Sequence, residues 1–275
     1  MKKYISFLAP AFLCFGLATA SAQLGKPGGA AADSAMLKVF GTNLNFSANM
    51  NVEIKMPAQD NDITMPGKIY FLQGKSRTEM DMTQMKGSKM PPHAADQMKA
   101  MGMDKMISIS RPDTKNVYLI YPGLESYTKL TVDKSPTDTS DTKIAKTELG
   151  KETLDGHPCA KNKYSVTNPD TGENLTMVAW TAADLKNYPI KIQIDAPEAT
   201  KGSKTPVSTT LHFTDLDTAS PAASLFEPPV GYHVYTDVQA MVQTEMMKKM
   251  AGANGMPPGH PAMPADHSAT PTGHP

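Results

Sequence analysis

The sequence predicts a mainly β fold: an antiparallel, strongly curved sheet or half-open β-barrel of about ten or eleven strands with covering helices. Three observations predict it. Apolar and polar residues alternate with period 2 over many short segments, tight turns separate these segments, and helical periodicity is scarce. Consecutive strands joined by short turns form a meander, which curls into a barrel or a bent sheet. The same order excludes the βαβ units of a nucleotide-binding fold.

The composition is that of a globular chain without a charge bias. The 275 residues include 27 basic and 27 acidic side chains, and 40% are hydrophobic. This length is sufficient for one large domain or two small ones, with a hydrophobic core. A formal net charge of zero argues against nucleic acid as a partner, because phosphates would require a basic face. The unusual number is methionine, with 20 residues.

The N-terminus predicts export from the cytoplasm. Lys2 and Lys3 precede an apolar run over 5–17, and Ala20-Ser21-Ala22 follows it. A basic, an apolar and an A-x-A segment in this order are typical of a signal peptide, here residues 1–22. The mature protein is therefore expected to be periplasmic or secreted, and not membrane-spanning. Its 25 basic and 27 acidic residues give a net charge of −2, and Cys159 is its only cysteine.

Residues 23–33 predict a linker, which precedes a single β domain over 34–251. A short helix is predicted from Ser34 to Phe40, before Gly41. The first strand follows and carries the clearest alternation in the chain. Its apolar positions share one face: Phe46, Ala48, Met50, Val52, Ile54 and Met56.

A hairpin is predicted next. Ile69 and Phe71 precede a turn at 73–75, and Met80 and Met82 alternate with charged residues after it. The remaining strands are expected within 107–109, 117–121, 126–132, 148–154, 159–166, 175–180, 189–194 and 207–213.

Helical pattern is confined to two further segments. Residues 91–101 begin with proline, which suits the first turn of a helix, and belong to a Met-rich insert over 83–105. The second helix is predicted over 236–250, with Thr236 as the N-cap of a capping box. The tail, 252–275, is rich in Pro and His and has no aromatic or branched aliphatic residue, so it is predicted to be disordered.

Catalytic motifs are scarce, and the chain is predicted not to be an enzyme. His157 and Cys159 place an imidazole and a thiol two residues apart on one strand, where they would share a face. A turn histidine beside a packed cysteine is the favoured interpretation of this pair. No other combination of nucleophile, base or metal ligands occurs at a usable spacing.

The methionines allow two interpretations. Met is flexible and polarizable, and it suits an apolar surface that adapts to varied ligands. Thioethers are also soft ligands for Cu(I), so a periplasmic copper-binding protein is an alternative, and copper is expected as a cofactor only in that case. The candidate metal ligands lie in the insert and the tail: Met98, Met101, Met103, His260, His267 and His274.

Several short motifs resemble the LolA-like family of periplasmic lipoprotein carriers, most closely its uncharacterised exported bacterial relatives. They occur in the family's order: Leu44–Ala48, Gly67–Phe71, Arg111–Pro122, Glu125–Tyr127 and Leu225–Tyr232. The resemblance covers roughly residues 36–235. It implies a half-open β-barrel whose apolar concave face binds acyl chains under a helical lid.

The function predicted from pattern and resemblance together is non-catalytic binding of a lipid or lipoprotein acyl chain. The protein is expected to be a monomer, with an envelope protein as a possible partner. A structural or protein-binding envelope module is a further alternative, which a well-packed interior without a pocket would favour. The expected lining is the apolar strand face: Met50, Val52, Ile54, Ile69, Phe71, Met80 and Met82.

Overall fold

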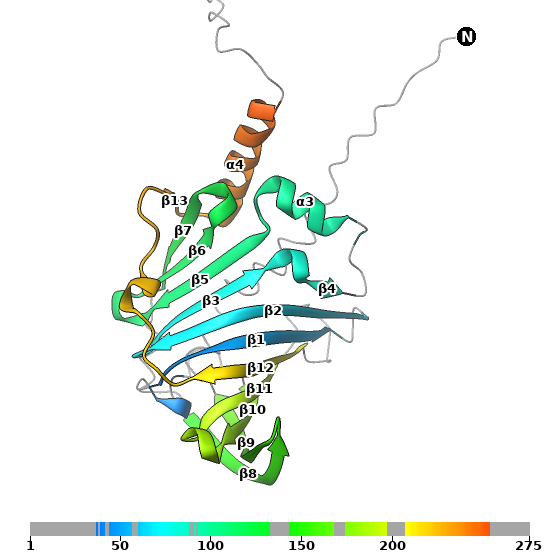
Figure 1. Cartoon of the computed structure of the whole chain (residues 1–275), viewed down its shortest axis with the longest axis vertical. Coiled ribbons are helices and arrows are strands. Elements are labelled where there is room, and N and C mark those ends of the chain that lie inside the picture. The colour runs from blue at the N-terminus through cyan, green and yellow to red at the C-terminus, as the bar shows by residue number, and fades with distance from the viewer. Residues whose placement is uncertain are drawn as a thin grey trace, which may run out of the picture.

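The computed structural model describes residues 37, 39–41, 44–56, 60–87, 91, 93–132, 143–167, 174–196 and 207–253. These residues form one large, curved and unclosed sheet with two α-helices near one end (Figure 1). The fold class predicted from the sequence is confirmed. The predicted signal peptide, the linker and the tail beyond Ala253 lie outside the described residues.

Thirteen strands are present among the described residues, in the lateral order β13-β7-β6-β5-β3-β2-β1-β12-β11-β10-β9-β8, with β4 paired to β2. The predicted count of ten or eleven was therefore too low, because the two- and three-residue strands β4 and β13 are too short to show alternation. The strands are β1 (Asn45–Met56), β2 (Asn61–Leu72), β3 (Lys75–Asp81), β4 (Lys86–Gly87), β5 (Lys105–Arg111), β6 (Asn116–Tyr121), β7 (Ser126–Thr131), β8 (Lys143–Leu154), β9 (His157–Thr167), β10 (Asn174–Ala182), β11 (Tyr188–Ala196), β12 (Val207–Asp217) and β13 (His233–Tyr235).

Strand β2 is longer than its sequence pattern indicates. It begins at Asn61, well before Ile69, and pairs with β1 along its full length. Pro66 lies inside the strand, although proline cannot donate a ladder hydrogen bond. Beyond Pro66 the second neighbour of β2 changes, because β4 pairs with Ile63 and Thr64 whereas β3 pairs from Gly67 onward. Pro66 therefore lies between the segment of β2 that pairs with β4 and the segment that pairs with β3.

Alternation along the central strands gives the sheet two faces of opposite character. We call the face that carries Phe46, Met50 and Val52 the inner face, since these side chains are buried in the main hydrophobic cluster. Asn49 and Asn51 lie between them in β1, are exposed, and mark the outer face.

Helix α3 (Ala94–Met101) covers part of the inner face. Its buried side chains, Ala94 and Met98, belong to the same cluster as Phe46. The helix ends at Gly102, which has φ +73°. The N–H of Met103 donates to the carbonyl of Met98 at 2.8 Å, the bond that defines a Schellman ending.

Helix α4 (Val238–Ala253) packs on the inner face near β7 (Figure 1). Met241 is fully buried in the main cluster. The predicted cap was wrong by one residue: Asp237, rather than Thr236, accepts the N–H of Ala240 on its side chain at 2.7 Å. A carboxylate also interacts favourably with the positive end of the helix dipole.

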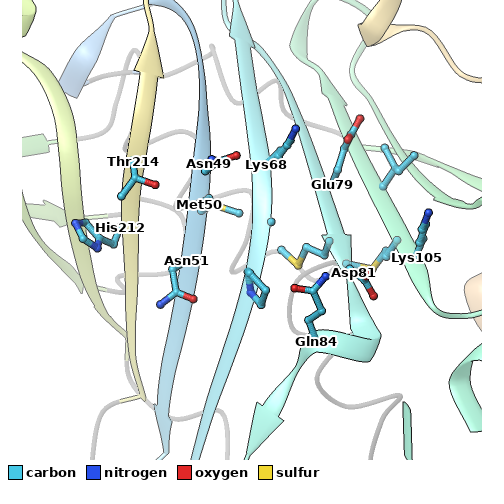
Figure 2. A pocket seen from close by; sticks show the side chains of 15 residues that line it. Asn49, Met50, Asn51, Lys68, Glu79, Asp81, Gln84, Lys105, His212 and Thr214 are labelled. Carbon is cyan, nitrogen blue, oxygen red and sulfur yellow. Dashed lines mark hydrogen bonds between the residues drawn. The ribbon is translucent and has the colours of Figure 1, made fainter. Parts of the chain in front are cut away.

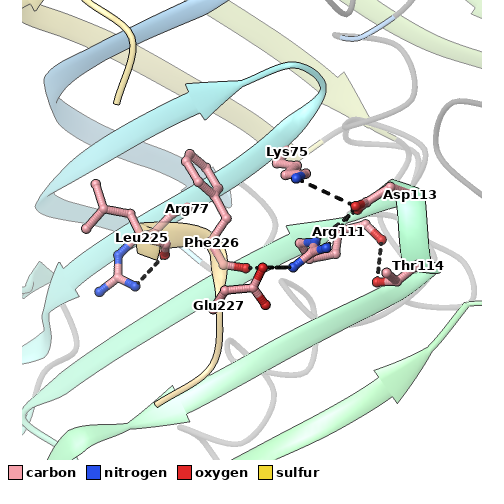
Figure 3. A network of polar contacts seen from close by, with 8 residues as sticks. All are labelled: Lys75, Arg77, Arg111, Asp113, Thr114, Leu225, Phe226 and Glu227. Atoms are coloured by element: carbon pink, nitrogen blue, oxygen red, sulfur yellow. Dashed lines mark hydrogen bonds and ion pairs between the residues drawn. The ribbon is translucent and has the colours of Figure 1, made fainter. Parts of the chain in front are cut away.

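The outer face of β5, β6 and β7 is covered by residues 222–232, which we call the strap. Phe226 of the strap is fully buried against Ile109, Tyr118 and Ile120. Figure 3 shows the polar contacts that hold it. Arg77 of β3 donates to the carbonyl of Leu225 at 2.8 Å.

Arg111 of β5 supplies the second attachment of the strap. Its guanidinium donates to the carbonyl of Phe226 at 3.4 Å and forms an ion pair with Glu227 (Figure 3). It also pairs with Asp113 at 2.8 Å, and this hydrogen bond holds the pKa of the Asp113 carboxyl below its usual range. The strap is thus fixed by one buried aromatic ring and two arginines from neighbouring strands.

Candidate functional site

The inner face carries a continuous apolar cluster that spans most of the sheet. Twenty buried residues belong to it, and eight of them are methionines. Phe46 of β1 belongs to this cluster. Its ring stacks on that of Phe71, with 5.0 Å between the ring centroids, and meets the ring of Phe213 edge-on at 6.1 Å. The buried methionines are Met50, Met65, Met80, Met85, Met98, Met106, Met177 and Met241.

All seven side chains predicted to line a ligand site lie in or against this cluster. Five of them are buried members: Met50, Val52, Ile69, Phe71 and Met80. Ile54 and Met82 are half-buried and pack against it. The cross-strand register explains the gathering, since Met50, Gly67, Met80 and Met106 face one another in a row across four strands. Their role in binding stays a prediction.

The structure places the candidate copper ligands of the insert on α3 and directly after it. Met98 is buried in the main cluster and Met103 packs against it, whereas Met101 is half-buried at the end of α3. No group of three or more His, Cys, Asp or Glu side chains arranged to hold a metal ion is found in the described part of the chain. His260, His267 and His274 lie outside it. The copper alternative stays a prediction.

Helix α4 is held on the sheet by apolar packing, in which the half-buried Val238 and Val242 accompany the fully buried Met241, and by one polar cluster. The hydroxyl of Thr128, on β7, donates to the Met241 sulfur at 3.5 Å, and both groups are fully buried. One turn later the Glu245 carboxylate accepts the Tyr235 hydroxyl at 2.6 Å and Lys248 Nζ at 2.9 Å. These hydrogen bonds, from Lys248 first, hold the pKa of Glu245 below its usual range. The other described side chains of α4 are exposed or half-buried.

Helix α3 is positioned by two glycines that cross at close range. Gly102, just after the helix, meets Gly123 in the 3-10 turn Pro122–Leu124. A Cβ on Gly123 would lie 2.6 Å from the Gly102 carbonyl oxygen, and one on Gly102 would lie 2.5 Å from that of Gly123. Only residues without a side chain permit this approach.

A polar groove lies on the outer face, across β12, β1, β2, β3 and β5 (Figure 2). Its volume is about 570 Å³. Sequence reasoning missed it, because polar side chains at alternate strand positions resemble an ordinary solvated face. The outward side chains that line it are Asn49, Asn51, Pro66, Lys68, Glu79, Asp81, Gln84, Lys105, Ile107, His212 and Thr214, and the lining is completed by Met50, Gly67, Met80 and Met106 of the same strands.

The histidine and cysteine of β9 do not form a nucleophilic pair in the structure. The Cys159 thiol donates to the backbone carbonyl of His157 at 3.3 Å, and the His157 ring instead lies 2.7 Å from the Asp184 carboxylate. Burial raises the pKa of the Cys159 thiol. A buried thiol with a raised pKa is a poor nucleophile near neutral pH.

A family model described as a domain of unknown function, DUF4412, matches residues 46–217. The chain belongs to the DUF4412 family. The match begins in β1 and ends with β12, so it contains the strands of the inner face together with α3. The strap and α4 lie beyond the DUF4412 segment. No curated protein matches the sequence.

Three solved structures share features of shape with this DUF4412 protein. The lipoprotein LppX of Mycobacterium tuberculosis has 10% identity and a TM-score of 0.37, and the match covers 71% of this chain and 99% of that one. A DUF1329 family protein from Desulfovibrio piger has 11% identity and a TM-score of 0.30, with coverage of 73% and 96%. A domain from Vibrio parahaemolyticus, described as an outer membrane lipoprotein-sorting protein, has 14% identity and a TM-score of 0.30, with coverage of 80% and 99%. These values are too low to transfer a ligand to this chain.

The described part of the DUF4412 protein contains no helix of the length and apolar character that a membrane crossing requires.

Proposed function

We propose that the protein is a non-catalytic binding protein of the cell envelope that takes an acyl chain of a lipid or lipoprotein onto its inner face. The observation that carries this proposal is the methionine-rich apolar cluster beneath α3 and α4. It supplies the apolar surface that an acyl chain requires, and α3 and α4, which cover part of it, bury few of their own side chains.

The composition of the inner face supports adaptable binding. Eight of its twenty buried residues are methionines, whose unbranched side chains rearrange at lower cost than branched ones. The face continues from Phe46 on β1 to Ile192 and Ile194 on β11, which provides a long apolar surface. A surface of flexible side chains adapts its shape to a flexible hydrocarbon chain.

The covering helices are attached at few points. Helix α3 buries Ala94 and Met98, and the described residues of α4 bury Met241 and Glu245. In the structure these side chains fill the inner face, so an acyl chain enters only when a helix shifts. Each buried methylene of the ligand contributes roughly 0.8 kcal/mol, so burial of a long acyl chain opposes the cost of displacing a helix. Elements with few buried contacts are also those that open locally.

The test is native mass spectrometry of the mature protein purified from the periplasm, together with lipid extraction from the same sample. A co-purifying lipid or acylated peptide is expected. Ile54→Asp places a charge at the half-buried end of the inner face and is expected to remove the ligand. Lys55→Asp is the matched control, because it adds the same side chain to the next, exposed position of β1 and is expected to retain the ligand.

Circular dichroism must show that both variants are folded. A wild-type protein free of lipid that also fails to bind a fluorescent fatty acid would contradict the proposal, and the structural envelope module would then be the better hypothesis. Equal lipid retention by Ile54→Asp and Lys55→Asp would place the ligand elsewhere on the molecule.

A further inference from the structure

The outer groove lies on the opposite side of the central strands from the proposed acyl site. Two structures flank it on the outer face. The strap covers the neighbouring strands on one side, and the β8–β9 turn approaches from the other, where Asp155 lies 2.5 Å from His212 Nε2. The groove therefore lies between two covered regions of the outer face.

Several side chains of the groove are held in place by hydrogen bonds from neighbouring side chains. Asn49 Nδ2 donates to Asp215 at 2.7 Å, and Glu79 accepts Arg77 Nε at 2.6 Å. Asp81 accepts the hydroxyl of Thr83 at 2.5 Å, together with Gln84 Nε2 at 3.1 Å.

The Thr83 hydrogen bond is the largest cause that lowers the pKa of Asp81, so this carboxylate is ionised at neutral pH. Polar groups that are oriented before a ligand arrives lose less entropy when they bind it.

Other side chains of the groove have no side-chain partner among the described residues. Within the described residues, Asn51, Lys68 and Thr214 form no side-chain hydrogen bond or ion pair. They lie on three adjacent strands and are exposed to the groove. Between them they offer an amide, an ammonium and a hydroxyl, which can donate and accept hydrogen bonds.

Charges of both signs line the groove. Its lining has two lysines, Lys68 and Lys105, and two carboxylates, Glu79 and Asp81, and a smaller adjoining cavity adds Asp215, whose carboxylate accepts the Asn49 amide. The register alternates them, with Lys68 opposite Glu79 and Asp81 opposite Lys105. An anionic ligand would meet the carboxylates and a cationic one the lysines, so the groove disfavours both. A neutral ligand rich in hydroxyl groups meets no such repulsion.

The groove also reaches an aromatic ring. A second cavity of about 190 Å³ shares Asn49 and Lys68 with the first and continues to Tyr70, which is half-buried. The apolar face of a sugar ring packs on an aromatic ring while its hydroxyls bond to the polar neighbours. Both cavities together fall in the size range of sites for small ligands.

From these observations we infer that the outer groove binds a neutral sugar unit of a glycan. The acyl chain and the glycan would occupy opposite faces of β1 and β2, so the two sites are separable by substitution. The sugar is recognised by the free amide, ammonium and hydroxyl of Asn51, Lys68 and Thr214. The oriented side chains of Asn49 and Asp81 complete the site.

The test is an array of immobilised neutral, acidic and amine-bearing glycans, probed with the full mature protein, followed by titration of the best neutral glycan. Retention of neutral glycans is expected, with little dependence on salt. Asn51→Ala and Thr214→Val are each expected to weaken binding about threefold to tenfold, the effect of one lost hydrogen bond. Thr210→Val is the matched control on the same strand and face, outside the groove, and is expected to bind like wild type.

Three results would overturn the inference: no neutral glycan retained, charged glycans preferred, or groove variants that bind as tightly as Thr210→Val. The Ile54→Asp variant keeps the outer face intact and is expected to retain the glycan even where it loses lipid. Failure of one site is therefore distinguishable from failure of the other.

Discussion

Strands β1, β2 and β3 carry two surfaces that alternate residue by residue along the same chain. On the inner face, Phe46, Met50 and Met80 are buried among other apolar groups and under helices. On the outer face, Asn49, Lys68 and Glu79 line an open polar groove. The inner face is ordered by packing, whereas the polar side chains of the outer face are ordered by hydrogen bonds, some from neighbours in sequence and some from distant residues. Stability therefore depends mainly on the first, and selective recognition of a polar ligand on the second.

The largest expected effect is the loss of a ring from the inner face. Phe46→Ala removes a fully buried side chain that contacts Phe71, Tyr188 and Phe213. We expect it to lower the free energy of unfolding by about 3 to 5 kcal/mol, measured by urea denaturation.

Asn49→Ala is the control on the outer face of the same strand. It loses one exposed hydrogen bond to Asp215, and we expect a loss of about 1 kcal/mol or less. Similar losses for the two variants would mean that the faces do not differ in the way proposed.

The inner face was accessible from sequence because its signal is local. Alternation from Phe46 to Met56 predicts a half-buried strand, and the register then brings the apolar residues of neighbouring strands together. Where the alternation of apolar and polar residues is interrupted, as in β2, the predicted strand was too short. Pro66 and Gly67 resemble the end of a strand, and the change of partner that accommodates Pro66 is visible only in the sheet.

The outer groove was not accessible from sequence because its order depends on distant partners. Asp215 is 166 residues from Asn49, and Asp155 is 57 residues from His212. A polar residue at every second position is what any solvated strand shows. The strap presents the same difficulty, since Arg77 and Arg111 bind backbone carbonyls 148 and 115 residues away.

A smaller effect is expected where α3 meets the sheet. Gly123→Ala places a methyl group 2.6 Å from the Gly102 carbonyl oxygen, so the two backbones must separate. We expect a loss of about 1 to 3 kcal/mol in unfolding free energy, the usual range for overpacking. Hydrogen exchange is expected to accelerate in residues 94–101, because the end of α3 loses its support.

Gly156→Ala is the control for the close contact between Gly102 and Gly123. Gly156 has φ +83° but no atom within 4 Å of its Cβ position, so its substitution adds backbone strain without a clash. It should destabilise the protein modestly and leave exchange in α3 unchanged. Equal protection of α3 in wild type and Gly123→Ala would show that the glycine crossing does not position the helix.

The smallest expected effect separates the polar anchor of α4 from its apolar one. The hydrogen bonds from Lys248 and Tyr235 hold the pKa of Glu245 below its ordinary value of 4.5. Because the folded pKa is depressed, the stabilisation is fully present above pH 4.5 and is lost as the pH falls through the folded pKa. Glu245→Gln keeps an acceptor for the Tyr235 hydroxyl and removes the titration. The stability advantage of wild type over this variant, followed by urea unfolding from pH 7 to pH 3, should be constant above pH 4.5 and shrink below it. An advantage that does not change with pH would show that apolar packing holds α4 without a contribution from the Glu245 charge, and acid would then leave the cover of the inner face in place.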